Sequence, residues 1–149
     1  FETIVDAGSG SGRQTIMLAR ELRKAVHAVD NHGPFLDDLR RRASEAGVGH
    51  LVETHLMDMA EIPRVFHDID LLWSEGAAYS IGFENALRTW APAMKPGGLI
   101  VVSELALLSE GGPRDVMDFL FGVYPAIQTT AQNIASGRGA GLRSVDTYT

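Results

Sequence analysis

The sequence contains no cysteine, which excludes disulfide bonds, thiolate nucleophiles and thiolate metal ligands. No apolar run approaches the ~20 residues that a membrane-spanning helix needs, and no charged-then-apolar leader segment is present. The five histidines show neither H-x-x-x-H nor H-x-H spacing, so we expect no bound metal. We expect a cytoplasmic protein.

The composition is that of an ordinary globular protein. The 149 residues, 45% of them hydrophobic, suffice for one domain with a sizeable core. The net charge is −6, and the run of Arg40, Arg41 and Arg42 falls within a helical pattern. We expect this run to form a solvated helix face, so we expect no nucleic-acid partner.

One segment near the N-terminus combines a short strand, an acid and alternating glycines. Two β-branched residues precede Asp6, and Gly8, Gly10 and Gly12 then occupy every second position before helix-forming residues at 14–22. A strand that turns through glycines into a helix lets a ligand lie against bare backbone at the helix N-terminus. The pattern predicts the first βα turn of a doubly wound nucleotide-binding sheet.

The spacing of these glycines distinguishes between nucleotide ligands. The dinucleotide fingerprint G-x-G-x-x-G would need glycine where Arg13 stands, and the Lys and Ser or Thr of a P-loop do not follow Gly12. The remaining pattern is D-x-G-x-G-x-G. Its acid favours a ligand with a cationic group, such as the ammonium and sulfonium of S-adenosylmethionine; a tight turn without a ligand is the alternative.

Strands and helices alternate along the chain, which predicts an α/β fold with a doubly wound, mostly parallel sheet and helices on both faces. Predicted strands span residues 3–7, 25–29, 51–55, 69–73 and 99–103, with a sixth at 142–147. Predicted helices span residues 14–24, 34–46, 60–66, 83–90, 114–123 and 128–136, and residues 95–98 form a turn. We expect residues 1–149 to form a single domain.

Acids follow each of the first four predicted strands: Asp6, Asp30, Asp58 and Glu75. Ligands of such sheets bind beyond the carboxyl ends of the strands, so the four acids should share one edge. Asp30 suits the ribose hydroxyls, or else it caps the helix that begins at Pro34.

Asp58 and Glu75, the acids after the third and fourth predicted strands, lie in segments that each have a ligand-binding and a purely structural interpretation. Asp58 can accept a hydrogen bond from an adenine amino group. Met57 and Met59 could flank the ring, or else fill gaps in the core. Glu75 opens onto the segment 76–79, or else it caps the following helix.

These motifs resemble class I S-adenosylmethionine-dependent methyltransferases of the small-molecule type related to ubiquinone and menaquinone biosynthesis enzymes. Residues 5–12 resemble the first family motif, with Ser9 where Cys or Gly is commoner, and residues 57–59 and 95–99 resemble the adenine segment and the turn into the fifth strand. Residues 73–84 are similar to the corresponding segment of a narrower subgroup of these methyltransferases. The resemblance implies S-adenosylmethionine as cofactor. The candidate cofactor-binding residues are Asp6, Gly8, Ser9, Gly10, Gly12, Gln14, Asp30, Asn31, Met57, Asp58, Met59 and Glu75.

Two family features are absent from residues 1–149. Members usually carry N-terminal helices that close over the substrate, and they finish with a seventh, antiparallel strand inserted between the fifth and sixth. We expect the cofactor site to be independent of both, and substrate capture to depend on them.

The resemblance implies methyl transfer to a small-molecule acceptor by in-line displacement. Glu75 and Tyr79 are the candidate catalytic residues, and His32 and Glu104 are further candidates for a general base. Residues 74–77 lack the Asn/Asp-Pro-Pro-aromatic segment found in enzymes that methylate amide or nucleobase nitrogens. Tyr79 and its apolar neighbours, Ile81 and Phe83, suit a partly apolar acceptor, or else pack a helix on the sheet.

Two rival functions remain at this point, and the oligomeric state is open. An NAD-dependent oxidoreductase would use the same fold and Asp30, although Arg13 argues against it. A domain that binds S-adenosylmethionine without turnover is compatible with every motif.

Overall fold

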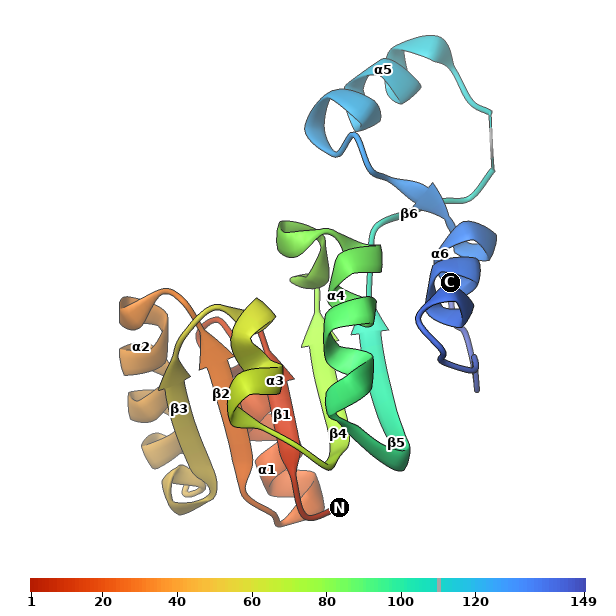
Figure 1. The fold of residues 1–149 in the computed structure, drawn as a ribbon. Helices are drawn as coiled ribbons and strands as arrows, with labels where there is room; N and C mark the ends of the chain where they lie inside the picture. The colour runs from red at the N-terminus through yellow and green to blue at the C-terminus, as the bar shows by residue number, and fades with distance from the viewer. Residues whose placement is uncertain (110) are drawn as a thin grey trace.

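A five-stranded parallel sheet forms the centre of the molecule in the computed structural model, which describes residues 1–109 and 111–149 (Figure 1). Its strand order is β3-β2-β1-β4-β5. The strands are β1 (Ile4–Ala7), β2 (Val26–Asp30), β3 (Val52–Leu56), β4 (Ile69–Glu75) and β5 (Met94–Ser103). The predicted fold class is confirmed. The strand order reverses between β1 and β4, the switch point at which such sheets bind ligands.

Helices cover both faces of the sheet (Figure 1). Helices α1 (Arg13–Leu22) and α2 (Gly33–Glu45) lie on one face, and α3 (Ile62–Val65) and α4 (Phe83–Trp90) lie on the other. Neighbouring strand residues therefore enter different cores: Ile4 packs with Leu18 of α1, whereas Val5 packs in the cluster around Trp90 of α4. This two-sided burial explains why β1, in the middle of the sheet, is buried at all four of its positions.

Trp90 ties α4 to the segment after β3. Its side chain is fully buried, and its indole N–H donates a hydrogen bond to the carbonyl oxygen of Met59 at 3.0 Å. Met59 begins the short 3₁₀ helix η2 (Met59–Glu61). This contact holds the end of β3 against the helix that follows β4.

The predicted turn at residues 95–98 is a bulge inside β5 rather than a boundary before it. Ile69 of β4 pairs with Met94, and Leu71 already pairs with Leu99, so residues 95–98 bulge out opposite Asp70. Gly98 is required there because a Cβ atom would lie 2.5 Å from the carbonyl oxygen of Ile69. The glycines therefore allow a close backbone approach within the strand.

The predicted sixth strand at residues 142–147 is wrong, because this segment forms local hydrogen bonds instead of a ladder. The Leu142 amide donates to Gly137 at the end of α6 (Thr130–Gly139), and Asp146 accepts from the Thr147 amide and the Tyr148 hydroxyl. Helix α6 begins two residues later than predicted, because Thr129 and Gln132 form a capping box.

The C-terminal part carries further elements beyond the sheet. The two-residue strands β6 (Ala106–Leu107) and β7 (Gln128–Thr129) pair in parallel, and α5 (Arg114–Val123) stands away from the sheet (Figure 1). Helix α6 lies beside α4. Ala140 and Leu142, which follow α6, pack against the core cluster that contains Trp90 of α4. No helix in the described part of the chain is long and apolar enough to cross a membrane.

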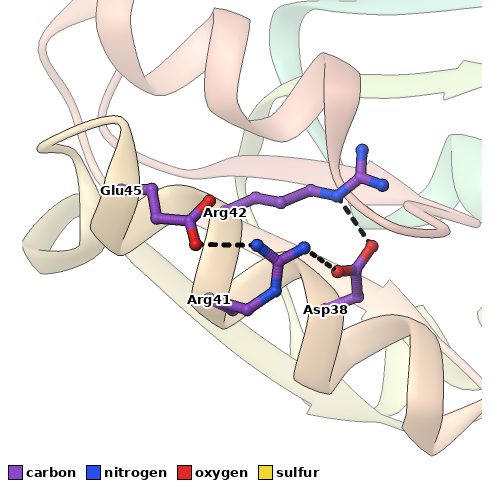
Figure 2. A network of polar contacts seen from close by, with 4 residues as sticks. All are labelled: Asp38, Arg41, Arg42 and Glu45. Carbon is purple, nitrogen blue, oxygen red and sulfur yellow. Dashed lines mark hydrogen bonds and ion pairs between the residues drawn. The ribbon is translucent and has the colours of Figure 1, made fainter.

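The arginine run lies on the exposed face of α2, as predicted. Arg41 pairs with Asp38 and Glu45, and Arg42 pairs with Asp38 at 2.7 Å (Figure 2). The hydrogen bond from Arg41 lowers the pKa of Asp38. The positive charges of this helix are thus largely offset by its own acids.

Candidate functional site

The glycine loop, defined as residues 8–12, joins β1 to α1 and is anchored on the end of β2. Gly8, Gly10 and Gly12 have φ of 74°, 53° and 85°, a left-handed conformation that residues with a side chain rarely adopt. The Gly8 and Ser9 amides both donate to the carbonyl oxygen of Val29, at 2.9 and 3.0 Å. The loop is therefore fixed before any ligand binds.

The loop is packed at both ends and bare in the middle. A Cβ atom on Gly8 would overlap Ala77, and one on Gly12 would overlap the buried side chain of Leu39. A Cβ atom on Gly10 would have no protein atom within 4 Å. Gly8 and Gly12 are thus needed for folding, whereas Gly10 leaves exposed backbone that a ligand can approach.

Asp30 links the glycine loop to the loop after β2. One carboxylate oxygen accepts from the Gly10 amide at 2.9 Å, and the other accepts from the His32 amide at 2.8 Å. The alternative that Asp30 caps the next helix is wrong, because His32 occupies the N-cap of α2 without a side-chain cap. Each carboxylate oxygen keeps a second lone pair for a ligand hydroxyl.

Asp6 is the buried acid of the site, with 2% of its surface exposed. Burial raises its pKa from 3.8 to about 6, the hydrogen bond from the Thr15 hydroxyl at 2.5 Å opposes this rise, and repulsion from Glu75 and Asp30 adds to it. Negative charge is therefore concentrated at the carboxyl ends of β1, β2 and β4. A cation placed there would be attracted by all three groups.

The sequence did not indicate the role of Thr15. It lies among the helix-forming residues at 14–22, which indicated no polar contact, but its hydroxyl is the hydrogen-bond partner of Asp6. A polar residue on an otherwise buried helix face, facing a buried strand acid, was the available signal.

Buried polar atoms without a partner accompany the site. Within the described residues, the hydroxyls of Ser9 and Ser74 are buried and make no hydrogen bond. Ser9 lies in the glycine loop, and Ser74 precedes Glu75. Gln14 is partly buried in the first turn of α1, and Asn31 is exposed directly after Asp30. Donors and acceptors for a polar ligand are therefore present around the bare Gly10 backbone.

Asp58 and its neighbours lie after β3, as predicted. The Asp58 carboxylate accepts from the Ala60 amide at 2.8 Å and so caps η2, a role that the sequence analysis missed. Met57 and Met59 are partly buried and pack against the core cluster of α4, which agrees with the gap-filling alternative. A Cβ atom on Gly8 would lie 3.0 Å from the Met59 methyl carbon, so this segment adjoins the glycine loop.

Glu75 is exposed at the end of β4, and the helix-cap alternative is wrong for it. The N-cap residues of the next helical segments, η3 (Ala78–Ile81) and α4, are Ala77 and Gly82, and neither segment has a side-chain cap. Tyr79 is 54% exposed, and its ring centroid lies 5.9 Å from that of Tyr124. Phe83 is buried in the core, and Ile81 packs beside it, so packing accounts for these two residues.

A second acid stands near Tyr124, whose ring adjoins that of Tyr79. Glu104 directly follows β5, its Oε2 atom is buried without a partner within the described residues, and burial raises the pKa of its carboxyl. Burial and the neighbouring Glu104 carboxylate both raise the pKa of Tyr124. A hollow of about 150 Å³ adjoins Tyr124 and Phe83. His32 lies elsewhere, after β2, against the Phe35 ring.

Comparison with known proteins identifies the family. A sequence model described as "Methyltransferase domain" matches residues 4–98. The chain belongs to this family. The prediction of the methyltransferase family is thus confirmed, whereas the narrower likeness to ubiquinone and menaquinone enzymes stays a prediction.

Individual relatives are longer than this chain. Dimethylglycine N-methyltransferase of Parasynechococcus marenigrum strain WH8102 is 29% identical over 102 residues, which are 68% of this chain and 36% of that protein. A crystal structure of an S-adenosylmethionine-dependent methyltransferase from Thiobacillus denitrificans, in complex with S-adenosyl-L-homocysteine, has a TM-score of 0.78 and 22% identity, covering 98% of this chain and 60% of its own. The crystal structure of the cyclase SpnF has a TM-score of 0.78 and 23% identity, covering 94% of this chain and 50% of its own.

The raised pKa of Asp6 predicts a specific pH dependence of stability. The folded state holds this proton more tightly than the unfolded state, so the contribution is fully present below pH 3.8 and is lost as the pH rises through about 6. The rise corresponds to about 3 kcal/mol, as an upper bound. Asp6→Asn should remove this decline, measured by urea unfolding of both proteins between pH 4.5 and 7.5.

The matched control is the exposed acid Asp37, changed to asparagine. Asp37→Asn should follow the parent protein across this pH range. A stability difference between Asp6→Asn and the parent that does not change with pH would contradict the assignment.

Proposed function

We propose that this chain binds S-adenosylmethionine at the glycine loop and directs its methyl group to a small-molecule acceptor. The observation that carries the proposal is the bare Gly10 backbone, held by Asp30 and placed beside the buried Asp6. The cofactor is cationic at its ammonium and sulfonium groups, and the three acids of this edge supply the complementary charge. Family membership supports the same reading.

The site residues divide into three groups by ligand part. Asp30 and Asn31 would receive the ribose hydroxyls, since the Asp30 oxygens keep free lone pairs. Residues 57–59 would border the adenine, because they follow β3 beside the loop. The glycine loop with Ser9 and Gln14, together with Asp6 and Glu75, would hold the amino-acid end.

The proposed mechanism relies on orientation. The cofactor supplies a methyl carbon on a sulfonium leaving group, and alignment of an acceptor with it can contribute roughly 7–11 kcal/mol. Glu75 and Tyr79 would border the acceptor at the end of β4. Glu104 joins them as the candidate base, because its buried carboxylate has a raised pKa and an unpartnered oxygen that could take a proton from the acceptor.

An NAD-dependent oxidoreductase fits the site less well. Asp6, Asp30 and Glu75 would repel a pyrophosphate at the edge where it would have to lie. Arg13 begins α1 in place of the third fingerprint glycine.

The second candidate function is a domain that binds the cofactor without methyl transfer. One fold can host unrelated reactions, and the structurally similar SpnF is named a cyclase. We therefore keep this second function as a candidate. Neither the cofactor-binding geometry nor the family match distinguishes the two.

The broader setting is also proposed. We infer that residues 1–149 act as one cofactor-binding domain of a cytoplasmic protein whose acceptor is a small molecule and not a nucleic acid. Cell fractionation and a nucleic-acid binding assay at physiological salt would test these points.

Methyl transfer itself is tested with the full-length gene product and a panel of small metabolites. We expect S-adenosyl-L-homocysteine to form with at least one acceptor, and Glu104→Gln to lower the rate by at least about tenfold if that acceptor carries a proton. The control is Glu21→Gln on the exposed face of α1. Cofactor binding without any product would favour the non-catalytic function.

Asp30→Ala should weaken S-adenosylmethionine binding by about one to two decades. The change removes charge-assisted hydrogen bonds worth roughly 1.5–3 kcal/mol each. Calorimetric titration measures the affinity, and thermal unfolding checks the fold. The control variant Asp37→Ala removes an exposed acid that pairs with Arg40 on α2 and should bind normally. Unchanged affinity in a folded Asp30→Ala protein would show that Asp30 only connects the two loops.

Gly10→Val should abolish measurable binding while the protein stays folded. The new Cβ atom meets no protein atom within 4 Å, so the main folding cost is backbone strain of about 1–2 kcal/mol, but the side chain occupies the space assigned to the ligand. Gly47→Val is the matched control, since Gly47 has φ of 75° and the same open surroundings outside the site. Equal affinities of the two variants would refute the placement of the ligand.

A further inference from the structure

A cluster of possible metal ligands lies on the neighbouring strands β2 and β3. His27 of β2 stands opposite Glu53 of β3 in the strand register, and His55 follows two residues later on the same face. His27 Nδ1 lies 3.1 Å from His55 Nε2 and 3.3 Å from a Glu53 carboxylate oxygen. The three ligand atoms all lie within 4.8 Å of one another.

We propose that His27, Glu53 and His55 form a binding site for a transition-metal ion of the Zn²⁺ type. Two imidazole nitrogens and one carboxylate oxygen are a donor set that zinc uses in proteins, with water in the fourth position. Imidazole ligands favour Zn²⁺, Cu²⁺ or Ni²⁺, whereas Mg²⁺ and Ca²⁺ favour oxygen ligands alone.

The spacing of these atoms suits tetrahedral coordination. Ligands about 2.0–2.1 Å from zinc lie roughly 3.3 Å apart along the edges of a tetrahedron. Two of the three ligand pairs already have such spacing. The Glu53 side chain is 62% exposed, so it can rotate to bring its oxygen toward His55 without displacing the core.

The surroundings hold the two rings in place. Phe66, which is nearly buried, packs against both imidazoles with ring centroids 5.0 Å from His27 and 5.1 Å from His55. Both histidines project from hydrogen-bonded strands, which position ligands more firmly than loops do. An apolar wall behind the ligands also limits the access of water from that side.

The basic residue Arg40 lies on the opposite face of the sheet from the cluster. Arg40 of α2 donates to the Thr54 hydroxyl, and Thr54 alternates with Glu53 and His55 along β3. Its side chain therefore lies on the opposite face of the sheet. The alternative is that the cluster binds no metal and is only a hydrogen-bonded histidine pair beside a carboxylate. The experiment has to distinguish this alternative from a metal site.

The histidine spacing in the sequence could not indicate this site. The ligands come from two strands that are neighbours only in the folded sheet, so no short H-x-x-x-H motif is formed. None of its three ligands is a candidate cofactor-binding residue, although His55 lies two residues before Met57 and pairs with Val29, whose carbonyl anchors the glycine loop.

The test is a calorimetric titration of the tag-free chain with ZnCl₂, with MgCl₂ as the comparison. We expect one saturable Zn²⁺ site per chain and none for Mg²⁺. His55→Gln should weaken Zn²⁺ binding at least about tenfold, since even partners outside the ligand set cost that much. His67→Gln, which changes an exposed histidine outside the cluster, should leave the affinity unchanged.

A second variant and a Co²⁺ spectrum distinguish the loss of a metal ligand from misfolding of the variant. Glu53→Gln changes an exposed side chain, so it should fold normally and still weaken the site. Co²⁺ should give the intense visible absorption of tetrahedral coordination in the parent chain and lose it in His55→Gln. No saturable Zn²⁺ binding, or equal binding by the parent and His55→Gln, would overturn the proposal and leave a plain histidine pair.

Discussion

The hydrogen bond from the Gly10 amide to the Asp30 carboxylate is the contact on which the arrangement of the site depends. Together with the Gly8 and Ser9 amides on Val29, it attaches the loop after β1 to the end of β2. The left-handed glycines make this possible, because they turn consecutive amides toward one neighbouring strand. The parallel sheet then brings the acids of β1, β2 and β4 to the same edge, where the loop leaves its backbone bare.

The electrostatics of this edge oppose folding and favour a ligand. Burial and two neighbouring carboxylates raise the pKa of Asp6 to about 6, so its ionised form destabilises the folded protein at neutral pH. A bound cation would remove part of this cost. Strained or repulsive groups of this kind concentrate at functional sites, which is why the acid cluster supports a cationic cofactor more than a turn without a ligand.

Local patterns predicted the sheet and the glycine loop, and they failed where the determining contact is distant. The alternation of apolar runs and glycine turns is enough to place β1, β2 and the strand-end acids. The strand predicted at residues 142–147 is wrong because Asp146 forms its own local hydrogen bonds. The pairing of Thr15 with Asp6, and of His27 with His55, depends on helix-to-strand and strand-to-strand contacts that no short motif encodes.

The central claim is that the cofactor lies on the glycine loop between Asp6 and Asp30. The most direct measurement is the change in amide chemical shifts of the ¹⁵N-labelled chain during titration with S-adenosyl-L-homocysteine. The account predicts the largest saturable changes at Gly10, Asp30 and Asn31, smaller ones at residues 57–59, and none around His27 and Glu53. Saturable changes confined to other surfaces, with the glycine-loop amides unmoved, would contradict it.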